Sequence, residues 1–162
     1  MPETREPPAT ATDGAPPDGA PPDGEILVDN GARRLTLDEL GRSQPGMGRL
    51  MPEVGARTWK AWYAARAGNW RLARWQLSEA AKLMELGAFV RPKYQVSMAK
   101  FLADDFNPVR QAVEDRDWEA FDGHFTRMVV RANYYHDVFD KGFIQWKLPD
   151  MAPPDLDLTP RD

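Results

Sequence analysis

The sequence predicts an all-α protein, an antiparallel four-helix bundle with a disordered N-terminal tail and an extended C-terminal segment. Two observations lead to this prediction. Apolar residues recur at intervals of three and four over four stretches of the chain, and Gly, Asn or Pro residues separate these stretches after short connections. No strand pattern of comparable length competes with the four stretches.

The composition limits the classes of function. The chain has 162 residues, which suit one domain, and a net charge of −4, which argues against a nucleic-acid partner. No apolar run is long enough to cross a membrane, so we expect no membrane association. There is no cysteine, and the N-terminus lacks the charged-then-apolar pattern of a secretory signal. We therefore expect a cytoplasmic protein.

The chain begins with two segments that precede the predicted bundle. Residues 1–24 repeat Asp-Gly-Ala-Pro-Pro and offer nothing apolar to bury, so we expect a disordered tail. Residues 25–48 contain short apolar patches at 26–28 and 35–37, and two acidic residues that open a brief helix around Leu40. We expect this second segment to lie as a strap over the bundle.

The first two helices of the bundle are predicted from their caps and stops. The first is expected over 52–67, with a proline in its first turn, where the missing N–H is not needed, and Gly68 as its stop. Asn69 then caps the second helix, expected over 70–86, and Gly87 stops it.

The third and fourth helices are predicted in the same way. The third begins near Lys93, and the Asn-Pro pair at 107–108 either kinks or restarts it. Asp117 caps a long last helix over 118–141, which Gly142 ends. The prolines after this point predict an extended segment that packs back on the bundle.

The apolar residues of each predicted helix fall on one face, as a bundle requires. The longest stripe is on the last helix and contains Phe121, Phe125, Met128, Ala132, Tyr135 and Phe139. The stripe of the third helix contains Tyr94, Met98, Phe101, Leu102 and Phe106. With these stripes, the predicted domain boundaries are a bundle over 49–149 and an extended C-terminal tail over 150–162.

Three motifs resemble those of a known family. Residues 62–77 contain Ala-Gly-Asn-Trp followed by Leu-Ala, 117–121 read Asp-Trp-Glu-Ala-Phe, and 142–149 read Gly-Phe-Ile-Gln-Trp-Lys-Leu-Pro. Together they resemble the small four-helix cytochrome c proteins of the cytochrome c prime-like type. The resemblance covers about residues 57–149. It implies a bundle that holds a haem beside its last helix.

The motif that would attach the haem is only partly present. The family carries Ala-Cys-Asn-Ala-Cys-His, and this chain has Arg-Ala-Asn-Tyr-Tyr-His at 131–136. His136 matches the axial ligand, but Ala132 and Tyr135 stand where the thioether cysteines would be. Covalent attachment is therefore excluded. The volume that a haem would occupy is either filled by side chains or kept as an apolar, aromatic pocket.

A pocket of this kind suggests a small-molecule enzyme. We expect a cofactor-independent lyase or decarboxylase that acts on an aromatic or other apolar substrate, with His136 and either Tyr134 or Tyr135 as acid and base. Arg131 is expected to hold an anionic group of the substrate. The other expected substrate contacts are aromatic and comprise Trp62, Trp75 and Tyr94.

Two alternatives remain open. In the first, the protein binds haem without a covalent bond, through His136. In the second, it is a non-catalytic binding or structural bundle whose former pocket is filled. A metal site is not expected, because His124 and His136 lie twelve residues apart on one helix and the chain has no Glu-x-x-His motif. The sequence leaves open a homodimer.

Overall fold

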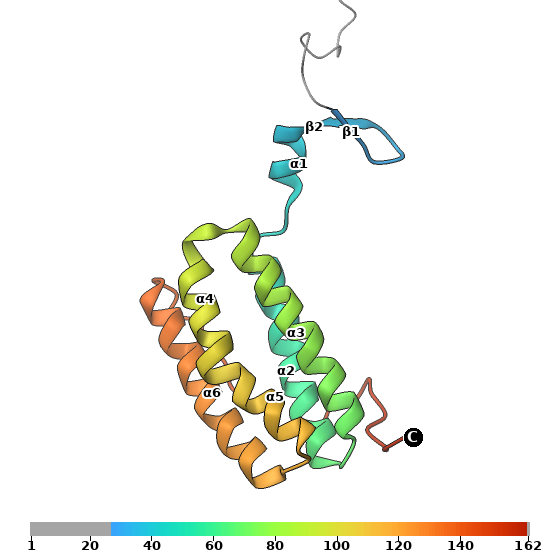
Figure 1. Ribbon diagram of the computed structural model, residues 1–162, viewed down its shortest axis with the longest axis vertical. Coiled ribbons are helices and arrows are strands. Elements are labelled where there is room, and N and C mark those ends of the chain that lie inside the picture. Colours follow the sequence, from blue (N-terminus) through green and yellow to red (C-terminus); the bar gives the residue numbers. More distant parts are fainter. Residues whose placement is uncertain (1–26, 162) are drawn as a thin grey trace, which may run out of the picture. The chain divides into compact units, whose positions relative to one another are not determined.

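The computed structural model describes residues 27–161, so the predicted disordered tail at 1–24 lies outside the described residues. The chain divides into two compact units, of which the first ends at Ser43 and the second begins at Gln44. The protein is mostly helical, as predicted, with one small sheet (Figure 1). Within residues 27–161, no helix is both long and apolar enough to span a membrane.

The first unit is a short hairpin followed by a helix. Strands β1 (Leu27–Asp29) and β2 (Arg34–Thr36) pair antiparallel. The hairpin was not predicted, because strands of three residues carry too few positions to reveal alternation. The helix predicted around Leu40 is confirmed as α1 (Leu37–Ser43).

A reciprocal capping box starts α1. The Glu39 amide donates to Thr36 Oγ1 at 3.1 Å, and the Thr36 amide donates to Glu39 Oε2 at 2.9 Å. Two amides that have no partner inside the helix are thereby satisfied. Because the amide of Thr36 donates to it, the pKa of the Glu39 carboxyl is lowered.

The second unit opens with α2 (Met47–Arg66) and α3 (Trp70–Val90), which pack along each other. Small buried residues on both helices allow this close contact, namely Ala61, Ala64, Ala65, Ala73, Ala80 and Ala81. Asn69 caps α3 as predicted, accepting from the Leu72 amide at 3.0 Å. The predicted start of the first helix at Pro52 was wrong, since α2 already begins at Met47 and Pro52 lies inside it.

The predicted stop at Gly87 was also wrong. α3 continues to Val90, and Gly87 is buried inside the helix. A Cβ atom at this position would lie 2.8 Å from the Met47 sulfur of α2. Gly87 therefore serves close packing between two helices and does not end one.

The third predicted helix is interrupted. A 3₁₀ turn η1 (Pro92–Tyr94) leads into α4 (Gln95–Phe101), a π-helical turn η2 (Leu102–Phe106) and α5 (Asn107–Glu114). The π turn ends directly before the Asn-Pro pair, so α5 begins where a kink or a restart was predicted. Proline in the first turn of α5 fits a helix start, where its missing N–H costs nothing.

The last helix is α6 (Trp118–Val138), capped by Asp117, whose side chain accepts from the Ala120 amide at 3.0 Å. It is shorter than predicted, because the chain enters the left-handed region at Asp140 (φ 55°) before it reaches Gly142. A Cβ at Gly142 would meet the end of the Asp137 side chain, so a larger residue there would require this carboxylate to move.

Successive long segments of the second unit run in opposite directions, and α6 lies beside α4 and α5 (Figure 1). The core between them is apolar and aromatic, and its largest fully buried side chains include Phe106, Leu77, Phe121 and Phe125. Each such side chain contributes about 1.5–3 kcal/mol relative to exposure. The predicted α6 stripe divides along the helix, because Phe121, Phe125 and Met128 are buried whereas Ala132, Tyr135 and Phe139 are only partly buried.

The residues after α6 contain no helix or strand up to residue 161 and pack against the helices of the second unit. Trp146, Leu148 and Leu158 contact the core. The Tyr63 hydroxyl donates to the Pro149 carbonyl at 2.8 Å, and Lys60 Nζ lies 2.6 Å from Asp155 Oδ2. The side chain of Asn69 donates to the Thr159 carbonyl at 3.1 Å.

Candidate functional site

A cavity of about 390 Å³ lies where the partly buried half of the α6 stripe faces α2 and α4. Its wall is completed by Met84 of α3 and by residues that follow α6. Of the positions expected to carry haem-attachment residues, Ala132, Tyr135 and His136 all line it. The volume is within the range of pockets that bind small molecules.

Methionine is the most frequent residue of the wall. Five of the seven methionines of the chain line the cavity, and they are Met47, Met51, Met84, Met98 and Met128. Their unbranched thioether side chains adapt to ligands of different shape and contact aromatic rings favourably. Aromatic residues supply much of the remaining wall, including Phe139 and Tyr94, whose ring centroids are 4.7 Å apart.

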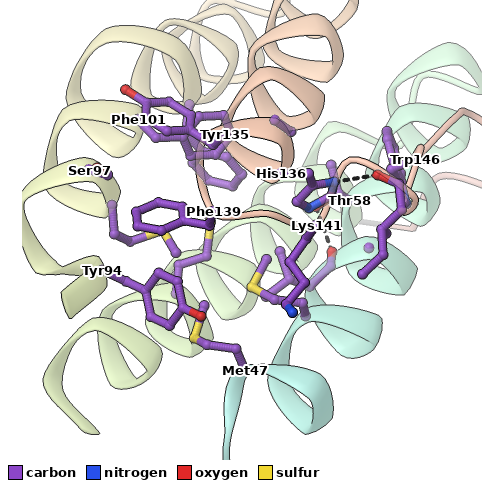
Figure 2. Close-up of a pocket in the computed structure, with 18 of the residues that line it drawn as sticks. Met47, Thr58, Tyr94, Ser97, Phe101, Tyr135, His136, Phe139, Lys141 and Trp146 are labelled. Carbon is purple, nitrogen blue, oxygen red and sulfur yellow. Dashed lines mark hydrogen bonds between the residues drawn. The ribbon is translucent and has the colours of Figure 1, made fainter. Parts of the chain in front are cut away.

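His136 places an imidazole at the edge of this apolar space (Figure 2). Its Nδ1 lies 2.8 Å from the Ile144 carbonyl oxygen. Because a backbone carbonyl can only accept, Nδ1 must carry the proton. In the neutral ring Nε2 then has the free lone pair, so it can accept a proton or bind a metal ion.

The segment after α6 is fixed beside His136 by Asn133. The Asn133 side chain donates to the Trp146 carbonyl and accepts from the Trp146 amide, both at 2.8 Å. The indole of Trp146 lies against α2, where a Cβ at Gly55 would be 2.8 Å from its Nε1. These contacts make Trp146 a fixed part of the cavity wall.

The two tyrosines of the wall differ in what they present to the cavity. The ring of Tyr135 packs edge-on against Phe101, with centroids 5.9 Å apart, and its hydroxyl points away from His136 (Figure 2). Tyr94, which was expected to bind substrate, directs its hydroxyl towards Met47 (Figure 2). Of the two tyrosines, Tyr94 is therefore the one whose hydroxyl is directed towards another residue of the lining.

Arg131 and Tyr134 lie outside the cavity lining. The guanidinium carbon of Arg131 is 4.5 Å from the centroid of Tyr134 and 5.4 Å from that of Tyr135. Its Nε lies 3.6 Å from Oδ2 of the buried Asp105, on the π turn. The charge that was expected to hold a substrate anion is thus directed at a carboxylate of the protein.

The two tryptophans expected at the site also lie away from the cavity lining. Trp62 is buried, with its Nε1 donating to Asp122 Oδ1 at 2.8 Å. Trp75 is half exposed on α3, beneath the guanidinium of Arg57. The structure therefore brings three of the expected residues together at one cavity, namely His136, Tyr135 and Tyr94.

Lys141 lines the cavity but was not predicted as a site residue. It follows the last turn of α6, beyond the apolar stripe that drew attention to this helix. The signal available in the sequence was its distance of five residues from His136, just past a helix end. A lysine there can turn back over the same face.

The cavity can accept an apolar molecule, offer it a basic imidazole nitrogen, and place a cation near one end. In the described part of the chain no group of three or more metal-binding side chains was found. Comparison of the chain with protein-family models, with curated proteins and with solved structures finds no match.

Proposed function

We propose that this protein binds a small apolar molecule, with an aromatic ring as its preferred body, in the cavity between α2, α4 and α6. The scaffold we propose is an antiparallel four-helix bundle of cytochrome c prime-like type. One observation carries the proposal: the cavity of about 390 Å³ is lined by methionine and aromatic side chains around a single imidazole. Pockets for small molecules have this character, an apolar wall with few polar groups.

The catalytic form of this proposal is a cofactor-independent lyase. His136 Nε2 would remove a proton from the substrate or return one to it, and the Ile144 carbonyl would hold the ring in the required tautomer. Tyr94 replaces Tyr134 and Tyr135 as the hydroxyl partner, because its hydroxyl is directed towards Met47 of the lining whereas that of Tyr135 points away from His136 (Figure 2). The apolar wall would keep bulk water from the reacting carbon.

Binding is tested by filling the cavity. Ala132→Trp places an indole in the cavity, whereas Val130→Trp, a matched control, adds the same group at a position of α6 that is 63% exposed. Isothermal titration with the neutral probe phenylbutanol should detect binding to the wild type and to Val130→Trp, and none to Ala132→Trp. Equal binding by both variants would show that the cavity is not the site.

Catalysis is tested at the histidines. For any substrate that is turned over, His136→Gln should lower kcat by about a hundredfold to ten-thousandfold, the usual range for a general acid or base. His124→Gln is the control, because His124 lies outside the cavity lining and contacts Arg127. An activity that survives His136→Gln would exclude this acid–base role.

The second candidate function is non-covalent haem binding, and the geometry of His136 favours it. An axial histidine typically donates its Nδ1–H to a carbonyl, which orients Nε2 towards the iron. The Ile144 carbonyl can fill this role here at 2.8 Å, which supports ligation of a haem iron by His136. A bound haem would supply one-electron or gas-binding chemistry, and the methionine wall would exclude water from it.

Haemin titration tests this candidate. A sharp Soret band should form in the wild type and in His124→Ala and should be absent in His136→Ala. Free-haemin absorbance throughout would exclude haem binding while leaving the small-molecule proposal intact.

A further inference from the structure

The cavity wall contains one side chain with a fixed charge. Among the described residues that line it, Lys141 is the one Lys, Arg, Asp or Glu. Figure 2 shows its side chain extending over the cavity next to His136. Lys141 itself is exposed to solvent, so its ammonium can pair with an anionic group that a ligand leaves at this side of the cavity.

Lys141 differs from most lysines of the described chain in having no carboxylate partner there. Four other lysines each form an ion pair with a carboxylate, and they are Lys60, Lys82, Lys100 and Lys147. The contact found for the Lys141 ammonium is the ring of Phe143, with the nitrogen 5.6 Å from the centroid. Its charge therefore remains available to a ligand.

The backbone fixes the position of Lys141. Its amide donates to the His136 carbonyl at 2.7 Å, and its own carbonyl accepts from the Ile144 amide at 2.8 Å. The same Ile144 holds His136 through its carbonyl. A short closed turn thus places the ammonium and the imidazole at one side of the cavity, on rigid backbone.

We propose that the natural ligand is an apolar monocarboxylate, an aromatic or aliphatic acid. The Lys141 ammonium would bind its carboxylate, and its apolar body would lie among the methionines, next to Nε2 of His136. This inference rests on the proposed function and specifies its ligand class. Lys141 thus takes the role of anion holder expected for Arg131, whose guanidinium faces Asp105.

The test compares an acid with its neutral alcohol in two lysine variants. Lys141→Met removes the charge and keeps an unbranched apolar stem. Lys147→Met makes the same change at an exposed residue that pairs with Asp150 outside the cavity. Isothermal titration with phenylbutyrate and with phenylbutanol, for the wild type and both variants, gives six dissociation constants.

Removing an ion pair made by an exposed lysine should weaken phenylbutyrate binding about twofold to fivefold in Lys141→Met. Phenylbutanol affinity should be unchanged in Lys141→Met, and Lys147→Met should leave both ligands unaffected. If phenylbutanol binds but Lys141→Met leaves phenylbutyrate affinity unchanged, the role of Lys141 is wrong and the cavity proposal stands. If neither probe binds the wild type, both proposals are wrong.

Discussion

Asn133 and Trp146 exchange two hydrogen bonds, each 2.8 Å long, between one amide side chain and the amide and carbonyl of one backbone residue. The pair joins α6 to the segment after it, which supplies part of the cavity wall. His136, three residues further along α6, repeats the contact at the Ile144 carbonyl. Two polar residues of the last turns of α6 thus hold the backbone of two residues that line the cavity.

Asn133→Ala should therefore destabilise the protein by about 1–3 kcal/mol, the worth of two net hydrogen bonds. Urea denaturation followed by circular dichroism measures this difference. Asn107→Ala is the control, because Asn107 is exposed and accepts only a long 3.4 Å contact from Arg110. The same loss of stability in both variants would mean that the bonds to Trp146 add nothing.

Replacing either of two helical glycines by alanine should change the stability of the protein, in opposite directions at the two positions. At Gly123 on α6, nothing lies within 4 Å of the place that a Cβ atom would take, so Gly123→Ala should stabilise the protein by about 0.5–1 kcal/mol through helix propensity. At Gly87 the new methyl would lie 2.8 Å from the Met47 sulfur and 3.5 Å from a Leu50 methyl.

Crowding at Gly87 costs about 1–3 kcal/mol, which exceeds the propensity gain, so Gly87→Ala should destabilise the protein. Thermal unfolding of the two variants shows whether each melting temperature lies above or below that of the wild type. A stabilised Gly87→Ala would show that Met47 swings aside at no cost, and would remove the packing explanation for this glycine.

The features that the sequence predicted correctly are local ones. Asn69 and Asp117 cap α3 and α6 because a cap needs only the amides three residues ahead. Gly87 was misinterpreted because its role depends on Met47, forty residues away in another helix. The sequence alone does not distinguish a glycine that ends a helix from a glycine that allows a second helix to pack closely.

The candidate site likewise has residues that could be predicted from local sequence and residues that could not. Periodicity on α6 correctly grouped Ala132, Tyr135 and Phe139, which line one cavity. It could not show that the Arg131 guanidinium faces Asp105, since that carboxylate is brought near by the π turn of another segment. Lys141 was missed because it lies beyond the helical pattern, in a turn whose path is set by hydrogen bonds to His136 and Ile144.

The C-terminal segment should carry an acid-sensitive turn. The Thr159 amide donates to Asp157 Oδ1 at 2.9 Å, and with Arg161 it lowers the pKa of the Asp157 carboxyl to about 2. A folded-state pKa below the unfolded value of about 3.9 means that the carboxylate stabilises the fold above that value. This contribution is lost as the pH falls through about 2.

A carboxyl-carbon NMR titration measures the Asp157 pKa directly. Arg161→Gln should raise it, because one of the hydrogen bonds to the carboxylate is removed, while Lys147→Gln should leave it unchanged. A wild-type value near 4 would show that the turn is not formed in solution.

Asn69 should contribute more to stability than an ordinary helix cap, because it also anchors the end of the described chain. Its Oδ1 accepts from the Leu72 amide, and its Nδ2 donates to the carbonyls of Leu158 and Thr159 at 3.4 and 3.1 Å. Asp117 provides the comparison, because its side chain makes the capping bond to Ala120 and is exposed.

Asp117→Ala should cost about 1 kcal/mol, the usual worth of a cap, and Asn69→Ala about 2 kcal/mol, because bonds to the C-terminal segment are lost as well. Asn69→Asp separates the two roles, since a carboxylate still caps α3 but cannot donate to the two carbonyls. Amide hydrogen exchange should then speed up around Leu158 while α3 stays protected. If exchange there is unchanged in Asn69→Asp, the segment is held by its apolar contacts, the Tyr63–Pro149 hydrogen bond and the Lys60–Asp155 ion pair.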